Sequence, residues 1–324
     1  MEKVKPIFLF SLPRSGSTLL QRLLMSHTEV VSTAEPWLLL PLVYSFRQEG
    51  TLSVYSHSHS YIALEDFIGN LSEQNAKLHE SLQTFSLSLY SDYCKNGEKY
   101  FLDKTPRYYQ IIDEISQIFP DAKFIFLFRN PIQIFTSIIL ALGERGLGNS
   151  YVSYYDLHEG PGLLVKGYKK LKDRSYAVQY EQLISAPEFY LKEMMEYLEL
   201  DYTQEMLKDF SAQNIEGRMG DKSGVKDYSS ISTEPLEKWK DVINNPVRKW
   251  YVKKYIKQID TQVLSDQGYD KFALIKEIDG LKTGRYFDSI RDLIELLYAF
   301  FVRKFKVTIF FGANTKWSRD VHIS

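Results

Sequence analysis

The chain has 324 residues, of which 44% are hydrophobic, and its formal net charge is −1 at neutral pH. This near-neutral charge excludes a global attraction to nucleic acid, so we expect no nucleic-acid partner and only local anion-binding clusters. Cys94 is the single cysteine, which excludes an internal disulfide framework and fits a reducing, cytoplasmic compartment. The sequence shows no signal-peptide pattern and no apolar stretch of membrane-spanning length, so we expect a soluble protein.

Residues 7–12 form the first continuous apolar run of the chain. A run without alternation predicts a strand that is buried on both faces, as in a parallel sheet. A Pro-Arg-Ser-Gly turn follows, and then a helix is predicted from Thr18, because its leucines fall on one face. Shorter strands are predicted at 30–32, 100–102 and 176–179.

The segment between this strand and helix, residues 11–18, reads Ser-Leu-Pro-Arg-Ser-Gly-Ser-Thr. A helix N-terminus offers unpaired N–H groups and a positive dipole end to a phosphate, and Gly16 lets the backbone approach an anion closely. The nucleotide-kinase pattern is broken, because Ser17 stands where that pattern has its lysine. Arg14 supplies a cation earlier in the loop, which suits a 5′-phosphate with one charged leaving group. The alternative is a tight strand-to-helix turn without a ligand.

A second buried strand is predicted at 123–128, followed by a turn, Arg129-Asn130-Pro131, and another helix. Arg129 ends the strand, and Ser137 follows eight residues later on the helix. The planar donor fork of an arginine and a serine hydroxyl both suit a phosphate. Two anion sites at strand ends indicate a nucleotide that is phosphorylated at two places, whereas each residue taken alone could be an ordinary surface side chain.

Strands that alternate with helices predict an α/β fold of three layers, with a central parallel sheet flanked by helices and ligands beyond the carboxyl ends of the strands. Residues 217–235 are rich in Gly, Ser, Asp and Lys and are expected to form a loop. A helix is expected from Pro246 to about Gln267. We expect one domain over 1–275 and a C-terminal helical appendage over 276–324.

The appendage carries an apolar stripe at helical spacing, followed by three basic residues. The stripe consists of Phe287, Ile290, Ile294, Leu297, Phe301 and Phe305, and the basic residues are Arg303, Lys304 and Lys306. Three interpretations are open: a helix packed back on the domain, a homodimer contact through 281–324, or peripheral contact with a membrane.

Taken together, these motifs resemble the sulfotransferases that use 3′-phosphoadenosine 5′-phosphosulfate (PAPS), and most closely the branch of tyrosylprotein sulfotransferases and bacterial members. Residues 13–18 resemble the Pro-Arg-Ser-Gly-Thr-Thr loop of that branch, and 124–137 resemble its 3′-phosphate motif. Weaker similarities are Leu-Asp-Lys-Thr-Pro at 102–106, Tyr-Glu-Gln-Leu at 180–183 and Lys-Trp at 238–239. By motif order the resemblance covers residues 5–270.

The resemblance implies a P-loop NTPase-like fold and transfer of a sulfuryl group from PAPS, as co-substrate, to an acceptor hydroxyl. The acceptor could be a carbohydrate, a small alcohol, a phenol or a tyrosine. The implied nucleotide contacts are Arg14, Ser15, Gly16, Ser17, Thr18, Arg129, Ser137, Tyr180, Ser223 and Lys238. For Tyr180 a purely structural place in the core is an equal alternative.

The resemblance also implies the catalytic residues. Glu35 lies 21 residues after Arg14, where the branch has a glutamate that looks like the general base. Arg14 and Lys104 would stabilise the charge that develops on the leaving oxygen. A histidine, with His57 and His59 first, is the alternative base. No cluster has metal-ligand spacing, so no metal is expected. The rival functions are a P-loop kinase of small molecules and a non-catalytic nucleotide-binding protein.

Overall fold

The computed structural model describes residues 4–141, 146–148, 150, 153–220, 230–284 and 286–304. The chain divides into two compact units. Unit 1 comprises Met1–Leu127, Lys166–Val178 and Ala186–Ile231, and unit 2 comprises Phe128–Val165, Gln179–Ser185 and Ser232–Ser324. None of the helices in the described ranges is long and apolar enough to cross a membrane.

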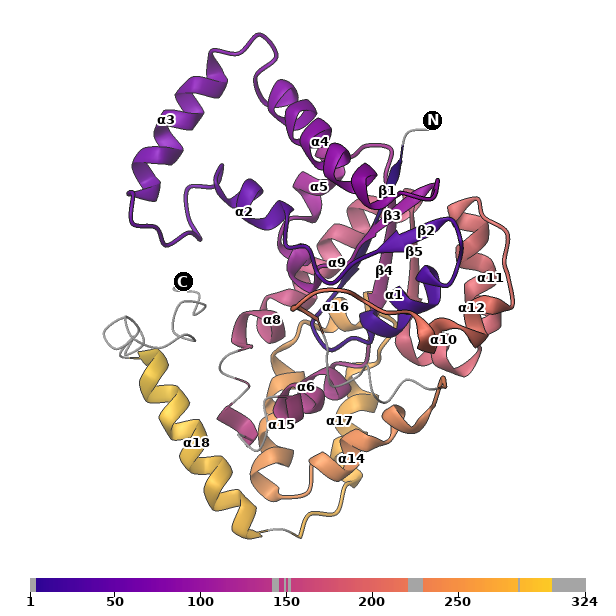
Figure 1. The fold of residues 1–324 in the computed structure, drawn as a ribbon. Helices are drawn as coiled ribbons and strands as arrows, with labels where there is room; N and C mark the ends of the chain where they lie inside the picture. The colour runs from indigo at the N-terminus through magenta and orange to yellow at the C-terminus, as the bar shows by residue number, and fades with distance from the viewer. Residues whose placement is uncertain are drawn as a thin grey trace. The chain divides into compact units, whose positions relative to one another are not determined.

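The centre of the fold is a five-stranded sheet with the order β2-β3-β1-β4-β5 (Figure 1). Its strands are β1 (Lys5–Ser11), β2 (Val30–Ser32), β3 (Tyr100–Asp103), β4 (Lys123–Phe128) and β5 (Ser175–Gln179). β1 runs parallel to both β3 and β4, and β2 runs parallel to β3. The predicted α/β class with a parallel sheet flanked by helices is therefore confirmed, and the predicted strands match within one or two residues at each end.

The sheet is buried because its central strands carry apolar side chains on both faces. Phe8 and Phe10 of β1 stack against Phe124 of β4, with ring centroids 6.2 and 5.9 Å away. In β1 and β4 the side chains of residues 7–11 and 124–128 are all buried. This core holds the two strands in a fixed register, in which Ser11 pairs with Leu127. The end of β1, where the phosphate loop begins, is thus rigidly placed.

Sixteen α-helices are assigned within the described residues, and the first nine lie between residues 17 and 185. They are α1 (Ser17–Met25), α2 (Leu39–Tyr44), α3 (His57–Gly69), α4 (Gln74–Tyr93), α5 (Ile112–Ile118), α6 (Pro131–Ala141), α8 (Tyr154–His158), α9 (Gly160–Leu171) and α10 (Tyr180–Ser185). The others are α11 (Pro187–Leu198), α12 (Glu205–Lys208), α14 (Lys238–Val242), α15 (Pro246–Gln258), α16 (Thr261–Asp266), α17 (Lys271–Gly280) and α18 (Tyr286–Lys304). Short 3₁₀ helices lie at η1 (Pro106–Gln110), η2 (Gly146–Gly148), η3 (Lys172–Arg174), η4 (Phe210–Ala212) and η5 (Glu234–Leu236).

The helix predicted from Pro246 to Gln267 is two helices, α15 and α16. The backbone of Ile259 is extended, with ψ of 134°. Asp260 then caps α16, because its side chain accepts from the backbone N–H groups of Gln262 and Val263. An aspartate that competes for backbone donors in this way starts a new helix rather than continuing the old one.

α18 packs on α15 and η2 of unit 2, as one of the three interpretations expected, but the described part of its apolar stripe is not the face that packs. Five of its residues are exposed, Phe287, Ile290, Ile294, Leu297 and Phe301, while Phe305 lies outside the described residues. The opposite face holds the helix in unit 2, where the buried Asp292 accepts from Nε of Arg248 at 2.8 Å and from Asn245 at 2.7 Å. α18 therefore attaches through polar contacts and presents its apolar face outward.

Candidate active site

The predicted phosphate loop joins β1 to α1 in unit 1. Two of its residues are left-handed, Arg14 with φ of 69° and Gly16 with φ of 86°. Gly16 is the residue before α1, and no side chain caps the helix there, so its first backbone N–H groups have no side-chain acceptor. This backbone turn is one that glycine adopts without cost and that Arg14 adopts at some strain. The loop has the local geometry of an anion cradle.

Two buried hydroxyls beside this loop strengthen that interpretation. Ser11 and Ser15 are buried, and neither hydroxyl oxygen has a hydrogen-bond partner within the described part of the chain. A buried hydroxyl without a partner is unfavourable, and a phosphate oxygen would satisfy it. Ser17 and Thr18 are also buried, on the first turn of α1.

The predicted base and the predicted catalytic lysine form one ion pair in unit 1. Nζ of Lys104 donates to Oε1 of Glu35 at 3.0 Å, and the two side chains are only 2% and 11% exposed. Nε1 of Trp37 donates to Oε2 of Glu35 at 3.2 Å, so both carboxylate oxygens are held. The structure thus brings together two residues that lie 69 positions apart in the chain.

A buried carboxylate that sequence reasoning missed supports this pair. Asp103, the last residue of β3, accepts from Oη of Tyr90 at 2.7 Å, from Oη of Tyr108 at 3.1 Å and from Oγ1 of Thr105 at 3.1 Å. Burial raises the pKa of Asp103 from 3.8 to about 6, although these hydrogen bonds and Lys104 act in the opposite direction. Burial and the Asp103 charge also raise the pKa values of Tyr90 and Tyr108 well above the usual range.

The Asp103 cluster is connected to the segment that carries Glu35. Oγ1 of Thr105 accepts from the backbone N–H of Trp37 at 3.3 Å, and Oη of Tyr108 accepts from the backbone N–H of Leu39 at 3.1 Å. Trp37 has a φ of 54°, a left-handed conformation that such contacts help to maintain. These hydrogen bonds connect the end of β3 to the loop after β2 and thereby orient Glu35.

The second predicted phosphate motif lies in unit 2, where Arg129 is held by its neighbours. Nε of Arg129 donates to Oε1 of Gln133 at 3.1 Å, and the guanidinium lies 4.2 Å from the centroid of the Tyr180 ring. Ser137 is half-buried and sits one turn beyond Gln133 on the same face of α6. The structure therefore brings Arg129 and Tyr180 together before the start of α6, and Ser137 lies further along that helix.

Tyr180 is buried, and burial raises the pKa of its hydroxyl. Its place beneath the Arg129 guanidinium fits the structural alternative, and contact with the nucleotide stays a prediction. The neighbouring Glu181 has a role that the sequence did not reveal. Its carboxylate accepts from the backbone N–H of Asn130 at 2.9 Å and from Oη of Tyr269 at 2.8 Å, which fixes the turn after Arg129.

The remaining predicted residues are placed less distinctively. Lys238 begins α14 and pairs with Glu234 at 3.0 Å on the solvent-exposed surface. Ser223 lies outside the described residues. Of the alternative bases, Nε2 of His57 lies 2.7 Å from the backbone oxygen of Arg47, and Nδ1 of His59 lies 2.6 Å from Oγ of Ser56. Within the described ranges no group of three or more His, Cys, Asp or Glu side chains is placed to hold a metal ion.

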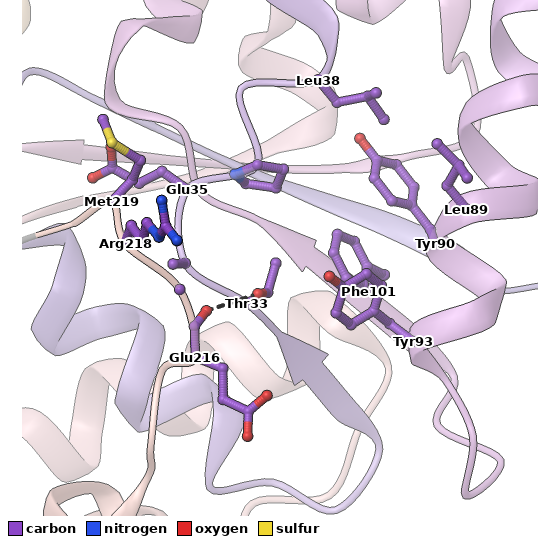
Figure 2. Close-up of a pocket in the computed structure, with 13 residues that line it drawn as sticks. Thr33, Glu35, Leu38, Leu89, Tyr90, Tyr93, Phe101, Glu216, Arg218 and Met219 are labelled. Carbon is purple, nitrogen blue, oxygen red and sulfur yellow. Dashed lines mark hydrogen bonds between the residues drawn. The ribbon is translucent and has the colours of Figure 1, made fainter.

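Glu35 also lines a pocket of unit 1 that sequence reasoning missed (Figure 2). The pocket holds about 660 Å³ of non-protein space, part of it open to solvent. It is lined by residues 33–36 and 38, by 89, 90 and 93 of α4, by Phe101 of β3 and by 216–219. Apart from Glu35, no motif marks these residues, because they are ordinary apolar and polar side chains brought together by the fold.

Residues 216–219 are tied to the loop after β2. The backbone oxygen of Glu216 accepts from the N–H of Ala34 at 2.9 Å and from Oγ1 of Thr33 at 3.0 Å, the latter drawn in Figure 2. Gly217 has a φ of 136°, and a Cβ there would lie 2.4 Å from the Cβ of Ala34. Glycine is therefore required for this close approach.

A family model described as "Sulfotransferase family" matches residues 6–204. The nodulation protein NoeE of Sinorhizobium fredii is 28% identical over 201 residues, which are 56% of this chain and 46% of NoeE. The chain thus spans about half the length of that relative. Protein-tyrosine sulfotransferase 2 of Gallus gallus is 25% identical over 290 residues, covering 82% of this chain and 70% of the relative.

Among solved structures, a sulfotransferase domain from the curacin biosynthetic pathway matches with a TM-score of 0.52 and 21% identity, over 79% of this chain and 97% of that domain. A sulfotransferase domain from the olefin synthase of Synechococcus PCC 7002 matches with a TM-score of 0.53 and 19% identity, over 79% and 94%. At these identities the likeness establishes the fold.

Proposed function

This chain belongs to the sulfotransferase family, and we propose that it transfers a sulfuryl group from PAPS to the hydroxyl of an acceptor. The observation that carries the proposal is the buried ion pair between Glu35 and Lys104, which joins the loops after two neighbouring strands of the sheet. The family match favours sulfuryl transfer over the kinase alternative, as does the absence of the kinase lysine at Ser17.

In the proposed reaction the acceptor oxygen attacks sulfur, and the bond between sulfur and the bridging phosphate oxygen breaks. The desulfated nucleotide, 3′-phosphoadenosine 5′-phosphate (PAP), leaves. Glu35 takes the proton of the acceptor hydroxyl as the new S–O bond forms. Lys104 and Arg14 stabilise the negative charge on the leaving oxygen, since cations in a site that excludes water are strongly effective there. The Trp37 indole and the Asp103 cluster hold the Glu35 side chain for this step.

We propose that the nucleotide binds through its two phosphate ends. Residues 14–18 would bind the 5′-phosphosulfate, with the uncapped start of α1 and the unpartnered Ser15 hydroxyl as local support. Arg129 and Ser137 would bind the 3′-phosphate, with the guanidinium pre-oriented by Gln133 and Tyr180. Ser223 and Lys238 are proposed as further nucleotide contacts on the family resemblance alone.

The catalytic assignment is tested with Glu35→Gln and Lys104→Ala. We measure transfer from ³⁵S-labelled PAPS to three probe acceptors, 2-naphthol, N-acetyltyrosinamide and octyl β-glucoside, and PAP affinity by calorimetry. Each change should lower turnover by about a hundredfold or more while PAP affinity stays nearly intact. The matched controls are Glu80→Gln and Lys77→Ala, which remove an exposed ion pair of 2.6 Å in α4.

Near-normal turnover of Glu35→Gln would reject Glu35 as the base and direct the test to His57 and His59. PAP binding without transfer to any probe by the wild type would favour the non-catalytic alternative. PAP should raise the melting temperature without magnesium, whereas ATP with magnesium should do so poorly, and the reverse result would favour a kinase.

We also propose that residues 281–324 contact an anionic membrane surface or a second copy of the chain. The support is the exposed apolar face of α18, which two partners could cover. Co-sedimentation with anionic vesicles at low salt would support membrane contact, and a dimer in analytical ultracentrifugation would support self-association. A monomer that ignores vesicles would reject both. Residues 276–324 are proposed as an appendage to a sulfotransferase domain at 1–275.

A cytoplasmic location is proposed on the cysteine content. Cys94 is the single cysteine, and burial raises the pKa of its thiol to about 11, so the reactive thiolate is scarce at neutral pH. Fractionation of the host cell with antibody detection tests this location.

A further inference from the structure

The pocket beside Glu35 has two chemically different sides (Figure 2). Leu89, Tyr90, Tyr93 and Phe101 lie on one side, whereas Glu35, Arg218 and Met219 lie on the other. Given the proposed function, in which Glu35 is the base, we propose that this pocket binds the acceptor and that the acceptor carries its hydroxyl on an uncharged, extended apolar body.

The apolar side is a continuous surface of rings and aliphatic groups. The ring of Phe101 stacks on Tyr90 at 4.4 Å and contacts Tyr93 at 5.4 Å. The Tyr90 hydroxyl donates to Asp103, so its polar end is already satisfied. Tyr90 and Phe101 are only 2% and 1% exposed, so they form the base of the wall, and Leu89 and Tyr93 present most of its accessible surface. This wall can therefore bury hydrocarbon without leaving the Tyr90 hydroxyl unpaired.

The wall continues along α4 beyond the pocket. Phe85, Leu89 and Tyr93 are spaced by four residues, which places them on one face of the helix. All three are large and exposed, at 47%, 42% and 50%. From Phe85 to Tyr93 the helix rises about 12 Å, so an apolar chain that starts at the pocket has a contact surface well beyond it.

The other side suits the polar end of such a molecule. Glu35, Glu216 and Arg218 line it, and Lys104 pairs with Glu35, so two acids and two bases give no excess of positive charge. An anionic acceptor would therefore find no electrostatic attraction there, whereas hydroxyl groups can bond to both the carboxylates and the guanidinium. The hydrogen bonds from Thr33 and Ala34 hold Glu216, and with it this wall, in place.

A pair of probes with the same hydroxyl groups tests the proposal. The PAP-bound protein is titrated calorimetrically with methyl β-glucoside and with octyl β-glucoside below its micelle concentration. Burial of only two of the added methylenes makes the octyl probe bind about tenfold or more tightly. Leu89→Ser and Tyr93→Ser should each remove most of this preference while PAP still raises the melting temperature as in the wild type.

The matched control is Phe67→Ser, which removes an exposed aromatic ring of α3, 64% exposed, that does not line the pocket. It should keep the octyl preference. Equal affinity of the wild type for the two probes would overturn the proposal. A loss of the octyl preference in Phe67→Ser as large as that in Leu89→Ser or Tyr93→Ser would also overturn it, as would tighter binding of an acidic tyrosine peptide than of octyl β-glucoside. Because these readouts are binding, they are separate from the Glu35→Gln turnover test, in which the proposed function itself succeeds or fails.

Discussion

Replacement of Asp103 by asparagine tests how the buried carboxylate under the candidate catalytic pair is stabilised. Because burial raises its pKa from 3.8 to about 6, the folded protein binds more protons at this group than the unfolded chain does between those values. Ionisation at Asp103 therefore lowers the free energy of unfolding as the pH rises through this window. The amide side chain of the Asp103→Asn variant is neutral at every pH, so the variant lacks this dependence.

The expected magnitude follows from the two pKa values. Between about pH 4.5 and pH 7 the wild type should lose about 2 kcal/mol of stability relative to Asp103→Asn. The assay is urea unfolding of both proteins at several pH values, with the difference between their unfolding free energies plotted against pH. Asp66→Asn is the control, because Asp66 is an exposed aspartate of α3 in the same unit. Its curve should run parallel to that of the wild type.

The opposite slope would refute the reasoning. If the hydrogen bonds from Tyr90, Tyr108 and Thr105 outweighed burial, the pKa of Asp103 would lie below its ordinary value, and the wild type would gain stability over Asp103→Asn as the pH rises. A flat difference would mean that the hydrogen bonds and burial cancel.

Three further predictions concern single contacts. Thr105→Val removes the hydroxyl that joins Asp103 to Trp37; it should cost about 1–3 kcal/mol in urea unfolding and lower turnover at unchanged PAP affinity, whereas Thr105→Ser should restore both. Arg129→Ala should weaken PAP binding by about 1.5–3 kcal/mol in calorimetry and leave adenosine 5′-phosphosulfate, which lacks the 3′-phosphate, unaffected; equal losses would assign Arg129 another role. Asp292→Ala leaves the Arg248 guanidinium without its carboxylate and should cost about 3–5 kcal/mol in thermal or urea unfolding, with partial recovery when Arg248→Met is added; a neutral effect would show that α18 is held otherwise.

Local patterns in the sequence were sufficient for the strands, for the turn between β1 and α1 and for the family. The uninterrupted apolar runs of β1 and β4 identify a sheet buried on both faces, because hydrophobic burial acts residue by residue along the chain. Gly16, at the end of the loop, is needed where the backbone is left-handed, and that requirement is also local. Glu35 and Lys104 were named from the family resemblance, and no local pattern places one beside the other.

The helical stripe of α18 shows where a local pattern misleads. Spacing identifies an amphipathic helix, but it does not say which face is covered. In the structure Asp292 attaches the helix and the apolar face stays exposed. Burial depends on which neighbours are present, and a periodic pattern contains no information about a neighbour that lies far away in the chain.

The sequence by itself determined the strand-loop-helix units and the family, since each depends on residues within a short stretch, and it predicted the two phosphate motifs. Only the tertiary structure decided that Lys104 pairs with Glu35, that Asp103 supports the loop of Trp37 and that Glu35 shares a pocket with Phe101. These contacts join segments about 65 or more positions apart. They arise because β3 lies between β1 and β2 in the sheet, and strand order is set by the packing of the whole core.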